Sequence, residues 1–168
     1  MKTSHLLIAA LLLGAAPLAH AQTANITVTG KVLPGTCTMA TSLPVALTDI
    51  DATALKDGHD NNLKAATLDF TGCVGVGSID LSFSGTADTA QDGHWKNLAS
   101  TGAASGVAVA LLDGSTTNYL KNGSTKTITV NGAATAKLDM RSGYYRKAGT
   151  PLVAGAVNTR ITVTAAYK

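Results

Sequence analysis

Few side chains in this sequence have the types and spacing that catalysis requires. Beyond residue 21 the only histidines are His59 and His94, and both lie in polar stretches. Neither stands in a motif typical of a hydrolase nucleophile or a zinc-binding helix. Residues 57–62 offer several oxygen ligands, but they lack the distal glutamate and the glycine position of an EF-hand loop. We therefore expect no enzyme activity, no metal site and no cofactor.

The only tryptophan, Trp95, directly follows His94 within the polar stretch of residues 86–105. Two interpretations of this pair are open. The face of the indole could stack on a sugar ring, which would make the pair a small sugar-binding site. Alternatively, the indole could anchor a long loop onto the domain, since it combines a large apolar surface with one N–H donor.

Cys37 and Cys73 are the two cysteines of the sequence, and their thiol groups could react with each other or bind a metal. Residues 1–21 are typical of a cleaved secretory signal peptide, with one lysine, an apolar run of about eleven residues and alanines at both small positions of the cleavage site. This run is too short to cross a bilayer, so we expect export and no transmembrane segment. In an oxidising compartment two cysteines favour a disulfide over a redox couple or a zinc site.

The composition favours a single all-β domain. The 168 residues are 45% hydrophobic and 14% charged and include 17 glycines, which is too apolar for disorder and too rich in glycine for a helical bundle. The ten acidic residues are all aspartates, so glutamate, a good helix former, is absent. The net charge of +3 is not gathered into basic clusters with aromatic residues, so we expect no nucleic-acid partner.

Apolar residues alternate with polar ones in several short segments, and turn residues separate the segments. The predicted strands lie at residues 66–70, 79–83, 107–111, 128–130, 138–144 and 157–167. Polar connections at residues 49–63 and 86–105 interrupt the pattern, and the first has room for one short helical turn. Many short strands punctuated in this way predict a β-sandwich or a β-barrel.

The two ends of the exported chain continue the alternation. In residues 24–32 the even positions are apolar or glycine and the odd positions are polar, which on pattern alone predicts an ordinary first strand. At the other end the chain stops while still in its last strand. A long apolar strand at a sheet edge favours pairing with another chain.

Taken together, these motifs resemble the structural subunits of type 1-like fimbriae, the pilins assembled by the chaperone-usher route. Residues 26–32 resemble the donor strand of that family, and the two cysteines fit its disulfide. Residues 83–88 and 106–113 resemble two further segments of the family in residue type and in their order along the chain. The most specific motif is C-terminal: Gly155 is the fourteenth residue from the end and Tyr167 is the penultimate one. The resemblance covers essentially all of the exported chain.

The resemblance implies an incomplete immunoglobulin-like β-sandwich, the pilin fold, which lacks its final strand and therefore exposes a groove. It divides the chain into a signal peptide (1–21), a donor-strand extension (22–32) and a pilin domain (33–168). The implied donor residues are Ala24, Ile26, Val28, Gly30 and Val32. The implied groove and chaperone-binding residues are Gly155, Val157, Thr159, Ile161, Val163, Ala165, Tyr167 and Lys168, the last through its carboxylate.

The function implied is that of a structural subunit that polymerises by donor-strand exchange and contributes to cell adhesion. Its partners would be a periplasmic pilus chaperone, an outer-membrane usher and neighbouring pilins in a head-to-tail filament. It would pass through the periplasm and end in the fimbrium on the cell surface. The alternatives are a sugar-binding fimbrial adhesin or minor tip or adaptor subunit, and a free secreted β-sandwich enzyme or binding domain. An adhesin of this family normally carries an additional lectin domain, for which the chain leaves no space.

Overall fold

The computed structural model describes residues 25–168, so the predicted signal peptide and Ala24 lie outside the described residues. The chain divides into two units, Met1–Lys31 and Val32–Lys168. In the first unit, residues 25–31 form no regular secondary structure and their side chains are exposed. Within the described part of the chain, no helix has the length and apolar character needed to span a membrane.

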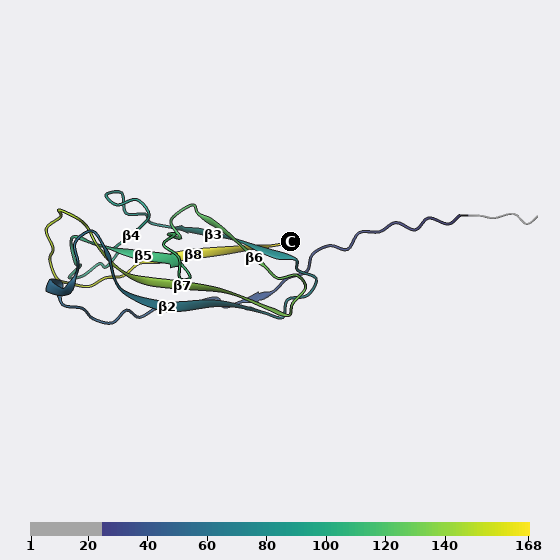
Figure 1. Ribbon diagram of the computed structural model, residues 1–168, viewed down its shortest axis with the longest axis horizontal. Helices are drawn as coiled ribbons and strands as arrows, with labels where there is room; N and C mark the ends of the chain where they lie inside the picture. The colour runs from purple at the N-terminus through teal and green to yellow at the C-terminus, as the bar shows by residue number, and fades with distance from the viewer. Residues whose placement is uncertain (1–24) are drawn as a thin grey trace, which may run out of the picture. The chain divides into compact units, whose positions relative to one another are not determined.

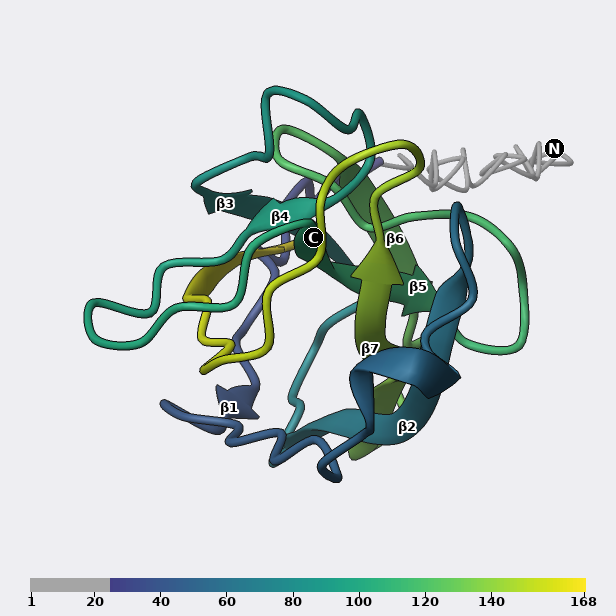
Figure 2. The same cartoon turned by 90° about the vertical axis from the view of Figure 1, so that its left-hand side faces the viewer.

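The second unit consists of two antiparallel β-sheets that face each other (Figure 1, Figure 2). The larger sheet has the strand order β1-β2-β7-β5-β4 and the smaller sheet has the order β6-β3-β8. The strands are β1 (Thr38–Met39), β2 (Asp60–Thr71), β3 (Ser78–Gly85), β4 (Trp95–Lys96), β5 (Val107–Asp113), β6 (Thr125–Thr129), β7 (Thr135–Arg146) and β8 (Ile161–Tyr167). A single 3-10 turn, Ala52–Ala54, occupies the connection before β2. The predicted all-β sandwich is confirmed.

The main core lies between the two sheets, because every second side chain of a strand points to the same face. Cys37 and Cys73 belong to this core and form the predicted disulfide, which joins the residue before β1 to the segment after β2. Closing a loop of this sequence separation, 36 residues, stabilises the fold by roughly 4 kcal/mol in the chain-entropy model. The largest fully buried side chains are those of Trp95, Phe70, Phe83, Ile79, Leu81 and Val76.

Two strands have other limits than the sequence predicts. β2 begins at Asp60, so residues 60–63 are part of a strand rather than of a connection. The last strand begins at Ile161, because its partner β3 ends at Gly85, which pairs with Ile161. Residues 157–160 run beyond the end of β3. They are held by Asn97, whose side-chain oxygen accepts a hydrogen bond of 2.9 Å from the backbone N–H of residue 158.

A second cluster of buried side chains lies on the other face of the larger sheet. The alternation in β5 predicts that its even residues are exposed, but the structure buries them as completely as the odd ones. Loops fold over this face and cover it, so β5 is buried on both sides. The cluster contains Ala108, Ala110, Leu112 and Tyr145, with Leu63 and Tyr119 packed against it.

The structure decides between the two interpretations of His94 and Trp95. Trp95 is 0% exposed, and its indole N–H donates a hydrogen bond of 3.0 Å to the carbonyl oxygen of Leu120. His94 is buried as well, and its ring lies 3.8 Å from that of Tyr145 between centroids. The indole face is therefore not available to a sugar ring, and Trp95 anchors the long loop onto the sandwich.

Candidate functional site: an open groove beside the last strand

The smaller sheet ends at β8, and this edge is open. Each residue from Ile161 to Tyr167 is paired with one of residues 79–85 in β3, on one side only. On the other side, no strand within residues 25–168 pairs with β8. The backbone N–H and C=O groups of this side are therefore free to form hydrogen bonds with an added strand.

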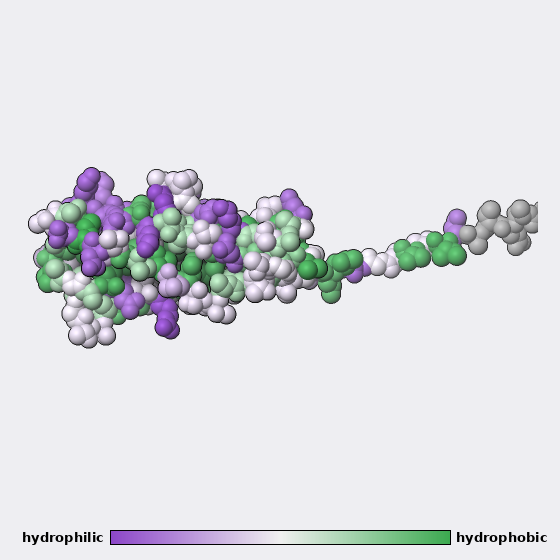
Figure 3. All heavy atoms as spheres, turned by 90° about the horizontal axis from the view of Figure 1, so that it is seen from below, coloured by the Kyte–Doolittle hydropathy of each residue, from purple (hydrophilic) through white to green (hydrophobic). Residues whose placement is uncertain are grey.

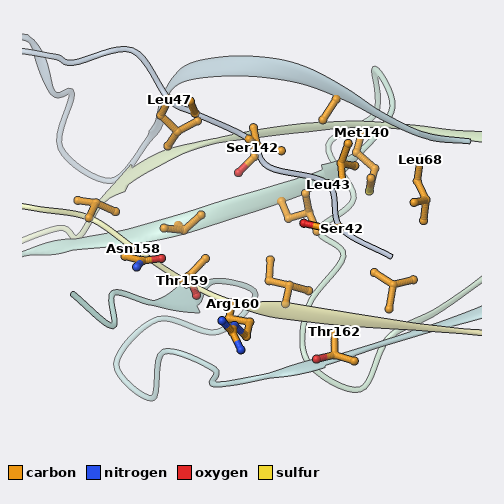
Figure 4. A pocket seen from close by; sticks show the side chains of 18 of the residues that line it. Ser42, Leu43, Leu47, Leu68, Met140, Ser142, Asn158, Thr159, Arg160 and Thr162 are labelled. Atoms are coloured by element: carbon orange, nitrogen blue, oxygen red, sulfur yellow. The ribbon is translucent and has the colours of Figure 1, made fainter. Parts of the chain in front are cut away.

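A groove of about 980 Å³ runs along this open edge. One wall consists of residues 155–163, and the other wall consists of residues 39–49. The floor comes from β2, β5 and β7 and includes Leu68, Leu111 and Met140. Figure 4 shows side chains from both walls and from the floor directed into the space between the ribbons.

The second wall is attached to the sandwich mainly by side chains of its neighbours. Residues 40–49 form no strand, although they run beside β2. The amide of Asn62 donates to the Thr48 carbonyl at 2.9 Å, and the Lys64 ammonium donates to the Ala46 carbonyl at 2.7 Å. The Tyr144 hydroxyl donates to the Thr48 carbonyl at 3.3 Å. Residues 40–49 of this wall are thus held in place without forming strand pairs.

The groove changes in character along its length. Towards one end it is apolar, with Leu68 and Met140, whereas Ser142, Asn158 and Thr159 lie towards the other (Figure 4). The Ser142 hydroxyl donates to the carbonyl oxygen of Ala110 at 2.9 Å and is satisfied within the domain. The Oγ1 atom of Thr159 is buried without a hydrogen-bond partner among residues 25–168.

Charged groups are scarce in the groove. Asp49 and Arg160 are the charged residues among those that line it, and both are exposed. The ion pairs found within residues 25–168 include neither of them. Burial, with a smaller contribution from the Asp49 carboxylate, raises the pKa of Tyr144 above its ordinary value. The Tyr144 side chain is thus a neutral hydrogen-bond donor at physiological pH.

The structure places five of the predicted groove residues in the lining, namely Gly155, Val157, Thr159, Ile161 and Val163. Ala165 and Tyr167 do not line the groove itself. Both are partly buried and pack against the main core from β8.

Gly155 has a structural reason to be glycine. A Cβ atom at this position would lie 2.7 Å from the backbone nitrogen of Ala104 and closer still to the carbonyl oxygen of Gly102. Only a residue without a side chain allows the backbone of residues 153–156 to approach the loop of residues 102–105. This close approach sets the end of the groove wall.

The C-terminal residue is held to the start of β3. A Lys168 backbone oxygen accepts hydrogen bonds from the N–H groups of Gly77 and Ser78, at 2.6 and 3.0 Å. The Lys168 ammonium pairs with the Asp80 carboxylate and, together with a hydrogen bond from Thr127, holds the pKa of Asp80 below its ordinary value. The last strand is therefore fixed at its end as well as along β3.

The predicted donor residues that the structure describes present exposed apolar side chains. Ile26 and Val28 are both 89% exposed, and Val32 is 91% exposed. Figure 3 shows that much of this stretch is hydrophobic. Isolated exposed apolar residues are common on proteins, but a row of them at every second position is not.

Sequence reasoning missed the second wall and the floor of the groove. The sequence alone predicts no role for residues 39–49, although Leu43, Val45 and Leu47 alternate with other residues as in a strand. That alternation is the signal that could have found the wall. Ser142 and Tyr144 could not be predicted as groove residues, because only the packing of the two sheets brings them into one lining with residues 155–163.

Comparison with known proteins agrees with this architecture. A family model described as fimbrial protein matches residues 26–168. The S-fimbrial adhesin protein SfaS of Escherichia coli is 33% identical over 153 residues, which cover 89% of this chain and 88% of SfaS. Protein FimG of Escherichia coli is 35% identical over 133 residues, which cover 77% of this chain and 75% of FimG.

Solved structures show the same fold. A chain from the structure of a chaperone-usher pilus superposes with a TM-score of 0.65 at 15% identity, covering 91% of this chain and 100% of that chain. Its fold is the immunoglobulin-like sandwich that the resemblance implied. The chain described here belongs to the fimbrial protein family.

Proposed function

We propose that this subunit polymerises by donor-strand exchange, in which residues 24–32 of one copy enter the groove beside β8 of the next. The observation that carries the proposal is the open apolar groove along an unpaired strand edge. A strand added there completes the smaller sheet and covers the exposed core, which is a known mode of peptide recognition. The exposed row of Ile26, Val28 and Val32 has the alternation that such a strand requires.

Apolar contact alone does not account for a durable filament. Burying Ile26, Val28 and Val32 stabilises the junction by about 5–8 kcal/mol, whereas association costs about 4–15 kcal/mol. A durable junction needs, in addition, the row of backbone hydrogen bonds to the open edge of β8. It also needs a high barrier to unfolding, because removing the strand reopens the core. Each copy donates in one direction and accepts in the other, so the contacts do not close and a filament results.

The same groove needs protection before assembly. An exposed apolar groove next to an unpaired edge favours aggregation. We propose that a periplasmic chaperone inserts one of its strands into the groove and binds the Lys168 carboxylate. We further propose that the donor strand of the next subunit replaces the chaperone strand at an outer-membrane usher. The signal peptide of residues 1–21 would direct the chain into the periplasm, and the exchanged filament would stand on the cell surface.

A peptide with the sequence of residues 22–34 tests the proposal. Added to the purified chain, it should raise the melting temperature markedly, because it fills the groove. Replacing Val28 by Asp in the peptide should abolish the gain, since this side chain faces the core. Replacing Thr29 by Asp should preserve most of it, since this side chain faces solvent. A chain indifferent to the native peptide would contradict the proposal.

Deleting residues 22–32 from the chain tests separately whether a copy can give a strand to its neighbour and whether it can receive one in its groove. The shortened chain should still bind the peptide, because its groove is intact, but it should not extend a filament. Electron microscopy of assembled material and a thermal shift with the peptide measure the two properties. Normal polymerisation of the shortened chain would show that another segment is the donor.

A role in adhesion is the second candidate function. SfaS is named as an adhesin, and the match with this chain covers 88% of the length of SfaS. The buried Trp95 is not the binding surface. Binding of fluorescent filaments to host cells, with and without competing sugars, would test this role.

A further inference from the structure

We propose that His94 carries a proton on both ring nitrogens in the folded chain at neutral pH and forms a pH-sensitive ion pair with Asp60. This pair holds residues 88–94 on the face of the larger sheet that lies opposite the main core. The inference goes beyond the proposed strand exchange, because it concerns two buried side chains that the exchange does not use. It rests on the atoms that surround the imidazole ring.

Both ring nitrogens of His94 face oxygen acceptors. The Nδ1 atom lies 3.1 Å from the carbonyl oxygen of Asp92. The Nε2 atom lies 3.5 Å from the Oδ1 atom of Asp60. A neutral imidazole has one N–H donor and one lone pair, so one of these contacts would place two acceptors against each other. A proton on both nitrogens turns each contact into one between a donor and an acceptor.

Burial makes these contacts important for the stability of the fold. The side chain of His94 is 3% exposed and that of Asp60 is 14% exposed. Within residues 25–168, the Nε2 atom of His94 and the Oδ1 atom of Asp60 are both buried without a hydrogen-bond partner. Buried polar atoms nearly always have a partner. Their separation of 3.5 Å is short enough for an ion pair, and a small approach of the two side chains would form a hydrogen bond.

The surroundings of the pair favour a negative charge on Asp60 and a positive charge on His94. The hydroxyl of Tyr119 donates a hydrogen bond of 2.8 Å to the other oxygen of Asp60, and such a bond favours the charged form of a carboxyl group. The rings of Tyr145 and Tyr119 lie 3.8 and 4.5 Å from the ring of His94 between centroids. Aromatic rings at this distance can attract a cation. The second proton is therefore assigned to the imidazole.

Two further ion pairs hold the same segment. The carboxylate of Asp88, which is buried, pairs with the ammonium group of Lys147. The carboxylate of Asp92 pairs with the ammonium group of Lys121 at 2.9 Å. Aspartate and lysine ordinarily keep their charges between about pH 6 and pH 9, whereas histidine changes its charge near neutral pH. Of these three ion pairs, only the one with the histidine should respond to pH in this range.

The direction of the pH dependence follows from the proton that the pair retains. Histidine in an unfolded chain loses its second proton at about pH 6.5. If the folded chain keeps this proton to a higher pH, folding favours proton uptake. The free energy of unfolding should then be greatest below about pH 6.5 and should fall as the pH rises above it. The neutral His94 again places its Nε2 atom against the carboxylate, which loosens residues 88–94.

NMR spectroscopy of the exported chain, residues 22–168, labelled with ¹⁵N, tests the protonation of His94. A ring nitrogen with a proton and a ring nitrogen with a lone pair have different chemical shifts. At pH 7.5 we expect both nitrogens of His94 to carry a proton in the folded chain. In urea at the same pH, about nine in ten histidine side chains should have one lone pair. Asp60→Asn should remove the second proton of His94 at pH 7.5, because the negative charge is lost.

Thermal unfolding measures the contribution of the pair to stability. Between pH 6.5 and pH 9 the native chain should lose about 5 °C in melting temperature. His94→Gln should lose less than about 2 °C over the same range, because glutamine can donate to Asp60 but does not change its charge. Lys121→Gln is the matched control, since it removes another ion pair of the same segment and leaves the histidine in place. It should keep the pH dependence of the native chain.

A lone pair on one ring nitrogen of His94 at pH 7.5 in the folded native chain would overturn the proposal. Equal losses of melting temperature in the native chain and in His94→Gln would overturn it as well. Neither outcome depends on strand exchange, because both are measured on the chain without added peptide. Failure of strand exchange would instead appear as no gain in melting temperature with the peptide of residues 22–34.

Discussion

Replacing Gly155 by alanine tests whether the groove wall depends on one close backbone approach. The added Cβ would lie 2.7 Å from the Ala104 nitrogen and nearer to the Gly102 oxygen, and both are backbone atoms that cannot rotate away. Relief requires the loop to move, which breaks the hydrogen bonds of 2.7 and 2.9 Å between Ala156 and residues 102 and 104. Each bond contributes about 0.5–1.5 kcal/mol, and overpacking costs about 1–3 kcal/mol. We expect the free energy of unfolding to fall by about 2–6 kcal/mol.

Urea unfolding of the chain saturated with the peptide of residues 22–34 measures this change, with the fluorescence of the buried Trp95 as the signal. Gly77→Ala is the matched control, because a Cβ there meets the Lys168 oxygen at an ordinary 3.4 Å. It should cost less than about 1 kcal/mol. A Gly155→Ala variant within about 0.5 kcal/mol of the native chain would refute the reasoning. So would equal losses in the two variants.

Three further predictions concern the domain around the groove. Trp95→Ala should lower the free energy of unfolding by about 3–5 kcal/mol, because a fully buried ring and its hydrogen bond are lost; chemical denaturation measures this, and a loss below about 1 kcal/mol would mean that the loop anchors itself elsewhere. Replacing Cys37 and Cys73 by serine should cost about 2–5 kcal/mol, whereas a native-like midpoint in the double variant would show that the loop is already ordered without the bond. Burial and a neighbouring carboxylate raise the pKa of Tyr119 to about 12 in the folded chain. Because the unfolded chain loses the phenol proton at a lower pH than the folded chain, the free energy of unfolding should decline as the pH rises from 10 to 12. Tyr119→Phe should flatten this part of the profile, and an absorbance titration of the phenol with its midpoint near pH 10 would contradict the raised pKa.

Much of the architecture could be predicted from local patterns in the chain. Alternation at residues 66–70, 79–83, 107–111 and 138–144 located four strands, because a strand with one buried face repeats its apolar residues with a period of two. The secretory pattern of the first residues and the even number of cysteines predicted the disulfide, since both depend on composition and compartment rather than on packing.

The same patterns could not locate the limits of the groove. The last strand begins at Ile161 rather than at Val157 because a strand requires a neighbour, and β3 ends where it meets Ile161. Burial of both faces of β5 was likewise invisible, because it depends on distant loops that fold over the sheet. The sequence shows Gly155 only as part of a family motif, and the reason for the glycine is the backbone of residues 102–104, which lies against it in the fold.

The order of residues along the chain thus specifies which faces are apolar and which segments are extended, because both properties arise from neighbours two positions apart. Which strands lie side by side, and which edge is left without a partner, depends on contacts between residues far apart in the sequence. The open edge of β8 and the placement of residues 39–49 across from it are of this second kind. Only the folded arrangement turns an alternating C-terminal segment into one wall of a groove that another strand can fill.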